Sequence, residues 1–156
     1  MSIVYLPHAP SSVSLARRSL NNDLLSWGVS EGVVDDAAVI LSELLSNALR
    51  HARPLPGDEG GIKISWIRVG DTVELAVTDG GAATEPRKGE PALSSLGGRG
   101  LGIVEILSQS WGVRRDDQGS TVWAHLHAPS RYAFENSEDR GAETGAPVQN
   151  LRQVTR

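Results

Sequence analysis

Hydrophobic positions recur at helical spacing in two segments of the N-terminal half. Within residues 11–27 the apolar positions of one helix face are Val13, Leu20, Leu24 and Trp27. The second segment follows Ser30, a residue type that caps helix N-termini, and stays apolar on one side through Ala52. Gly28 separates the two segments, and glycine commonly ends a helix. We therefore predict two long helices.

Shorter runs of β-branched and apolar residues predict strands, at residues 3–6, 62–69, 72–78, 113–115 and 121–126. Gly70 and Asp71 lie between the second run and the third, which is a signal for an antiparallel hairpin. The segments 53–61 and 79–98 are rich in glycine and proline and predict loops. Loops as long as the second one are usually functional or disordered.

A third helix is predicted to begin after the glycine cluster that precedes Leu101 and to end near Trp111 and Gly112. The order helix, helix, hairpin, helix, hairpin then predicts an α+β fold. This is a two-layer α/β sandwich with helices on one face of a mostly antiparallel sheet. Residues 129–156 have scattered apolar positions with no period, which predicts a disordered tail. We expect a single domain at residues 1–128.

Composition narrows the classes of function. The chain has no cysteine, which excludes disulfides and thiolate metal sites. Its net charge is -4, and the four arginines of residues 129–156 balance four acidic residues there, so the body is acidic and direct nucleic-acid binding is not expected. The longest apolar run, residues 37–41, is far shorter than the roughly 20 residues of a membrane span. The first ten residues do not form a secretory signal, so we expect a cytoplasmic protein.

The second predicted helix carries a polar stripe beside its apolar face. The stripe consists of Glu43, Asn47, Arg50 and His51. Successive residues of a helix are rotated by about 100°, so the last three lie within about 80° of Glu43 around the helix axis. A carboxylate and an amide at the edge of a buried face are candidates for chemistry. The stripe by itself also fits a solvated face, with His51 placed near the negative end of the helix dipole.

Two glycine-rich segments are further candidates. Asp79 precedes Gly80 and Gly81 at a strand end, where a carboxylate could accept a hydrogen bond from an exocyclic amine and the glycines leave room for a flat ring. The same residues also suit a plain turn. The second segment, 97–102, reads GGRGLG and opens a helix, where free backbone N–H groups and Arg99 could hold phosphates. It matches neither a Walker P-loop nor a dinucleotide fingerprint, and a flexible hinge is the alternative.

The order of these segments resembles the nucleotide-binding boxes of the GHKL ATPases, which include gyrase, Hsp90, histidine kinase and MutL types. The segments read ELLSNALRH, DGG, GGRGLG and GSTVW, and together they span most of residues 10–127. The phrases SELLSNALRHA, VTDGG and GGRGLGIVEILSQSWGV look like those of the anti-sigma-factor serine/threonine kinases and their actinobacterial relatives. The resemblance implies the Bergerat ATP-binding fold, with ATP and Mg²⁺ as cofactors, in residues 1–128.

The resemblance also implies roles for individual residues. Asn47 would be the Mg²⁺ ligand, and Glu43, one turn earlier, would orient or deprotonate the attacking hydroxyl. Asp79 would accept from the adenine amino group. The rest of the nucleotide site would comprise Arg50, Gly81, Gly98, Arg99, Gly100, Leu101, Gly102 and Thr121, with Ser120 a less favoured substitute for Thr121. One departure is Ala83, which stands where the family commonly has the last glycine of its D-x-G-x-G box.

Two functions compete on this basis. The first is a serine/threonine kinase that phosphorylates a small anti-anti-sigma (STAS-like) antagonist and, in its other state, sequesters a sigma factor. The second is an ATP-binding switch module that binds a transcription regulator without transferring phosphate. An ATP hydrolase without a protein substrate is a weaker third interpretation. The resemblance also implies a homodimer formed through the N-terminal segment.

Overall fold

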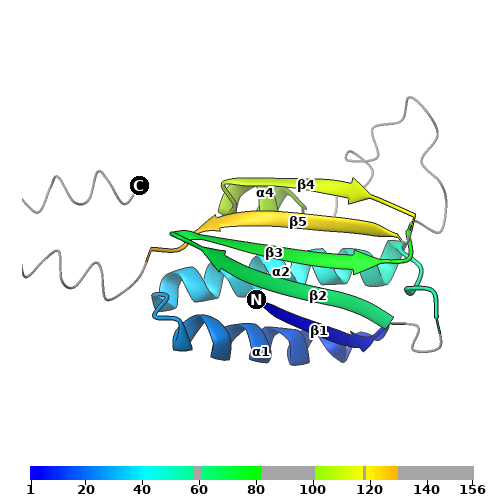
Figure 1. Ribbon diagram of the computed structural model, residues 1–156, viewed down its shortest axis with the longest axis horizontal. Helices are drawn as coiled ribbons and strands as arrows, with labels where there is room; N and C mark the ends of the chain where they lie inside the picture. Colours follow the sequence, from blue (N-terminus) through cyan, green and yellow to red (C-terminus); the bar gives the residue numbers. More distant parts are fainter. Residues whose placement is uncertain (58–60, 82–100, 118, 130–156) are drawn as a thin grey trace, which may run out of the picture.

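The computed structural model describes residues 1–57, 61–81, 101–117 and 119–129. Its elements are β1 (Ser2–Pro7), α1 (Ser12–Ser26), α2 (Glu31–His51), β2 (Gly61–Val69), β3 (Thr72–Asp79), α4 (Gly102–Leu107), β4 (Ser110–Arg115) and β5 (Ser120–His127). The strands form one five-stranded sheet in the order β1-β2-β3-β5-β4, and every neighbouring pair is antiparallel. The helices cover one face of this sheet (Figure 1). The predicted α+β sandwich is therefore confirmed.

The hydrophobic core lies between the sheet and the two long helices. Leu20 and Leu24 of α1, Leu41 and Leu45 of α2, and Trp66 of β2 are all almost fully buried. Side chains alternate across each strand, so every second residue of the sheet enters this core while the residues between face away from the helices. Residues 130–156 of the tail predicted at 129–156, and most of the predicted loop 79–98, lie outside the described residues.

The predicted end of the third helix is wrong. Helix α4 ends at Leu107, and Trp111 and Gly112 belong to strand β4 instead. Strand pairing outweighs helical spacing here because Trp111 lies opposite Ala124 in the ladder with β5. Gly112 also fits only this packing, since a Cβ at that position would overlap the ring of Trp123.

The C-terminal end of α2 is joined to the end of β3 by backbone hydrogen bonds. The amide of Arg53 donates to the carbonyl of Gly81 at 2.8 Å, and the amide of Gly80 donates to the carbonyl of Arg53 at 2.7 Å. His8, just after β1, shares a hydrogen bond of 3.1 Å between its Nε2 and the carbonyl of Ala52. These contacts hold three separate segments together at one end of the sheet, on the right in Figure 1.

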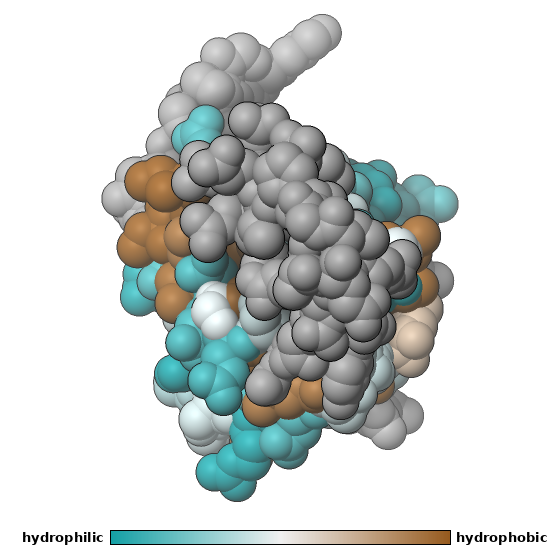
Figure 2. Space-filling model, turned by 90° about the vertical axis from the view of Figure 1, so that its left-hand side faces the viewer, coloured by the Kyte–Doolittle hydropathy of each residue, from teal (hydrophilic) through white to brown (hydrophobic). Residues whose placement is uncertain are grey.

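The opposite end of the molecule has a mixed surface. Figure 2 views this end and shows hydrophobic residues in separate patches among hydrophilic ones. Val69, the last residue of β2, is one of the exposed hydrophobic residues, with 68% of its surface accessible. Within the described part of the chain, none of the helices combines the length and the hydropathy that crossing a bilayer requires.

Candidate functional site

A cleft lies beside the C-terminal half of α2, where β3 and β4 end and β5 begins. Its volume is about 540 Å³ when its open mouth is included. The residues that line it come from α2, three strands and the start of α4, and they are Leu44, Asn47, Ala48, His51, Ala52, Asp79, Leu101, Val113, Arg115, Ser120 and Val122. Most of the walls are apolar, with a few polar groups at defined places.

Strand register places three of the polar residues in a row. Asp79 lies opposite Ser120, and Ser120 lies opposite Arg115. Because side chains alternate along a strand, Val113 and Val122 face the same side as this row. The three strand ends thus present a carboxylate, a hydroxyl and a guanidinium above an apolar floor.

Asp79 is the buried acceptor of the cleft. The carboxylate is 5% exposed, and its Oδ1 accepts a hydrogen bond of 2.7 Å from the amide of Gly81, whose φ of 97° suits glycine. Burial raises the pKa of Asp79, while the Gly81 amide and the positive charges of His8 and Arg115 act in the opposite direction. Oδ2 has no donor among the described residues, so it can accept a hydrogen bond from a ligand.

Asn47 lies at another wall of the cleft and is also buried, with 6% of its surface exposed. Neither its Oδ1 nor its Nδ2 has a hydrogen-bond partner among the described residues. Leaving a buried amide unpaired costs about 1–3 kcal/mol, so such a group in a cleft indicates a ligand contact. An amide oxygen is a hard donor of the kind that Mg²⁺ accepts.

The structure brings together only part of the expected site. Leu101 lines the cleft and is 2% exposed, whereas Gly102, at the start of α4, is exposed and does not line it. Glu43 is half-buried and Arg50 is exposed on α2, and neither lines the cleft. The other expected phosphate contacts, together with the departure at Ala83, lie outside the described residues, and those contacts are Gly98, Arg99 and Gly100.

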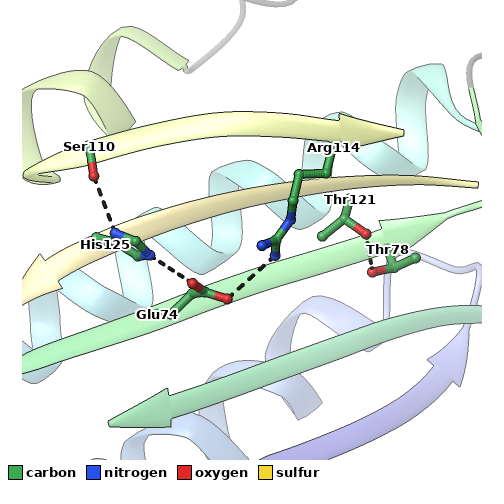
Figure 3. Close-up of polar contacts among 6 residues, drawn as sticks. All are labelled: Glu74, Thr78, Ser110, Arg114, Thr121 and His125. Carbon is green, nitrogen blue, oxygen red and sulfur yellow. Dashed lines mark hydrogen bonds and ion pairs between the residues drawn. The ribbon is translucent and has the colours of Figure 1, made fainter. Parts of the chain in front are cut away.

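Thr121 does not reach the cleft. Its hydroxyl shares a hydrogen bond of 2.8 Å with the hydroxyl of Thr78, on the face of the sheet that the helices leave uncovered (Figure 3). The neighbouring Ser120 faces the cleft instead. The preference for Thr121 over Ser120 is therefore reversed, because a shift of one residue along a strand changes the face on which the side chain lies.

Arg115 is a cleft residue that the sequence analysis did not select. The signal for it was present in the alternation of the strand, since Val113 is apolar and Arg115 is two residues further along. His51 was placed on the polar stripe but was assigned no ligand contact, and it also lines the cleft.

Comparisons with known proteins agree with this architecture. The family model for the histidine kinase-like ATPase domain matches residues 6–126. A serine-protein kinase RsbW from Listeria monocytogenes serotype 4a is 32% identical over 129 residues, covering 75% of this chain and 81% of that protein. The RsbW of Bacillus licheniformis is 27% identical over 155 residues, covering 92% of this chain and 90% of that protein.

A crystal structure supports the same fold. It contains the RsbU and RsbW domains of Rv1364c from Mycobacterium tuberculosis, with a TM-score of 0.60 and 18% identity. The match covers 84% of this chain and 34% of that longer chain, so the present protein spans about a third of it. The matched family model confirms the resemblance to the GHKL ATPases, and its name implies that the domain binds ATP. The chain belongs to the histidine kinase-like ATPase domain family.

Proposed function

We propose that this chain is an ATP-dependent serine/threonine protein kinase of the anti-sigma-factor type. It would phosphorylate a small STAS-like antagonist protein and sequester a sigma factor in its other state. The names of the two RsbW relatives, each a serine-protein kinase, support the kinase activity. The observation that carries the proposal is the buried, unpaired amide of Asn47 in the same cleft as the buried carboxylate of Asp79.

The residues of the cleft fit a nucleotide with its metal ion. Asp79, with Ser120 beside it, would hold the amino edge of the base, and Asn47 would give Mg²⁺ an amide oxygen. The described residues contain no cluster of three or more His, Asp or Glu side chains that could hold a metal. Mg²⁺ commonly takes few protein ligands and completes its shell with phosphates and water. Bound ATP would supply the phosphoryl group, and Glu43, one turn before Asn47, would accept the proton of the attacking hydroxyl.

Replacing Asn47 with alanine tests the metal assignment. We expect about 10- to 100-fold weaker ATP binding in the presence of Mg²⁺, because one contact to a charged group is lost. With EDTA in place of Mg²⁺, the variant and the wild type should bind ATP equally. Isothermal titration calorimetry with and without Mg²⁺ measures both values.

The control is Asn22→Ala, which removes an exposed amide from α1 and should change neither value. Equal Mg²⁺-dependent binding by wild type and Asn47→Ala would remove the metal assignment. If the wild type binds no ATP under either condition, the proposal fails as a whole.

Replacing Asp79 with asparagine should separate binding from stability. The Gly81 amide would still donate its hydrogen bond to the side-chain oxygen of the asparagine. The new NH₂ group would then face the amino group of the base, and two donors cannot form a hydrogen bond. ATP affinity should therefore fall about 10- to 100-fold. Unfolding temperature should stay the same or rise. The raised pKa means that the folded state binds the proton more tightly, so wild-type stability falls as pH rises from the ordinary aspartate pKa through the raised one.

Asparagine carries no charge to bury, so the pH-dependent part of this loss should be absent in the variant. Thermal unfolding of both proteins between pH 4 and pH 8, together with ATP titration at neutral pH, makes the comparison. A variant that binds ATP as the wild type does would show that Asp79 does not contact the base.

The switch module without phosphoryl transfer remains the second candidate. One observation favours it: Glu43, the proposed base, does not line the cleft in the described structure. An ATP-binding protein without a positioned catalytic base could still bind or release a partner protein according to the nucleotide that it holds. The two candidates differ in whether the chain transfers phosphate, and substitution of Glu43 distinguishes them.

A further inference from the structure

Two consecutive arginines at the end of β4 have different surroundings. Arg114 faces the uncovered side of the sheet, where its Nη2 lies 3.5 Å from Oε1 of Glu74 (Figure 3). Its guanidinium also lies 5.9 Å from the centre of the Trp123 ring. Arg115 faces the other side and lines the cleft. It is exposed and forms no hydrogen bond or ion pair with another residue of the described chain.

The distance between Arg115 and Asp79 is set by the sheet. Their strands, β4 and β3, lie on either side of β5, so their backbones are two strand spacings apart, about 10 Å. At this backbone separation the side chains of Arg115 and Asp79 are not held together as a close ion pair. The space between them leaves room for a flat ring above Val113 and Val122. The charge of Arg115 nevertheless acts on the carboxylate of Asp79. Both side chains therefore face the same volume from opposite sides.

The carboxylate of Asp79 cannot select adenine alone. An acceptor oxygen at this place suits any base with an exocyclic amino group, and both adenine and cytosine have one. Adenine has two fused rings and cytosine has one. A second contact on the far side of the slot would discriminate between them, because only the larger base spans it.

We propose that Arg115 is a specificity-determining residue of the base site, which selects purine over cytosine nucleotides. Its planar guanidinium packs on the face of the purine at the open edge of the cleft, in a cation–π contact. A pyrimidine held by Asp79 ends before it reaches this group. The inference rests on the proposed nucleotide site and adds a residue that acts on the base.

The experiment compares ADP and CDP, since both carry the same phosphates. Affinities are measured by calorimetry, with CDP also measured by displacement of a fluorescent ADP derivative. Arg115→Ala should weaken ADP binding about 3- to 10-fold and leave CDP binding within twofold. The matched control is Arg114→Ala, which removes the same charge from the neighbouring position on the opposite face and should leave both affinities within twofold.

A third variant separates stacking from charge. Arg115→Lys keeps the positive charge but loses the planar group, so it should recover only a small part of the lost ADP affinity. Full recovery by lysine, or an equal loss of ADP and CDP in Arg115→Ala, would show that Arg115 attracts the phosphates and would overturn the inference. An unchanged ADP affinity in Arg115→Ala would overturn it as well. If the wild type does not bind ADP, the proposed function itself fails.

Discussion

Replacing Glu43 with glutamine should lower the rate of phosphoryl transfer about 100- to 10,000-fold while ATP affinity stays within twofold. Glu43 lies one helical turn before Asn47 on α2, so both side chains project from the same side of the helix. Glutamine has nearly the same shape but cannot take the proton of the attacking hydroxyl. It should therefore affect the reaction and spare the binding of the nucleotide, whose proposed contacts lie in the cleft.

Transfer is measured with γ-labelled ATP and a STAS-type antagonist as acceptor, in single-turnover reactions. Asp35→Asn is the matched control, because it neutralises an exposed carboxylate on the same helix and should leave the rate unchanged. A Glu43→Gln variant that transfers at the wild-type rate would exclude Glu43 as the base. A wild type that binds ATP and transfers to no acceptor would favour the switch module.

Replacing Gly119 with alanine should destabilise the whole fold. A Cβ at this position would overlap the carbonyl oxygen of Asp79, which is backbone and cannot rotate away. Gly119 is also held by the turn before β5, where its amide donates to Oδ1 of Asp116 at 3.0 Å. We expect a loss of about 1–3 kcal/mol in the free energy of unfolding and a melting temperature lower by about 5–15 °C.

Gly32→Ala provides the control for this substitution. Gly32 lies near the start of α2, and a Cβ there would meet nothing within 4 Å. Alanine favours helix, so this variant should be as stable as the wild type or more stable by up to about 1 kcal/mol. Thermal and urea unfolding of both variants give the comparison. Equal stability of Gly119→Ala and Gly32→Ala would contradict the close approach of β5 to the end of β3.

The periodic parts of the sequence predict the fold well. The long helices and the hairpin from β2 to β3 are visible because their apolar positions repeat at 3.6 or 2 residues. The end of α4 was missed because Trp111 is apolar at a spacing that also continues a helix, and only its ladder partner Ala124 on β5 decides the matter. The local pattern of apolar residues does not reveal which strand a residue will pair with at long range.

The two buried polar residues of the candidate site could be predicted from the sequence, whereas the residues that depend on the register of β4 and β5 could not. Asn47 and Asp79 were selected because a polar residue beside an apolar face or at a strand end is unusual, and the structure places both in one cleft. The choice between Ser120 and Thr121 depends on the register of β5 to a single residue. Arg115 was overlooked because two adjacent arginines look alike in sequence, although the sheet sends them to opposite sides.

The backbone connection between Arg53 and Gly80–Gly81 has a consequence for how the chain could report its nucleotide. These hydrogen bonds join the segment after the helix that carries Asn47 to the end of the strand that carries Asp79, so the two proposed nucleotide contacts lie on connected backbone. In the proposed site, a triphosphate and a diphosphate would meet Asp79 at the base in the same way. We therefore expect any difference between the two loaded forms that a partner protein senses to arise at the phosphate end of the cleft, toward Asn47, Leu101 and the first turn of α4.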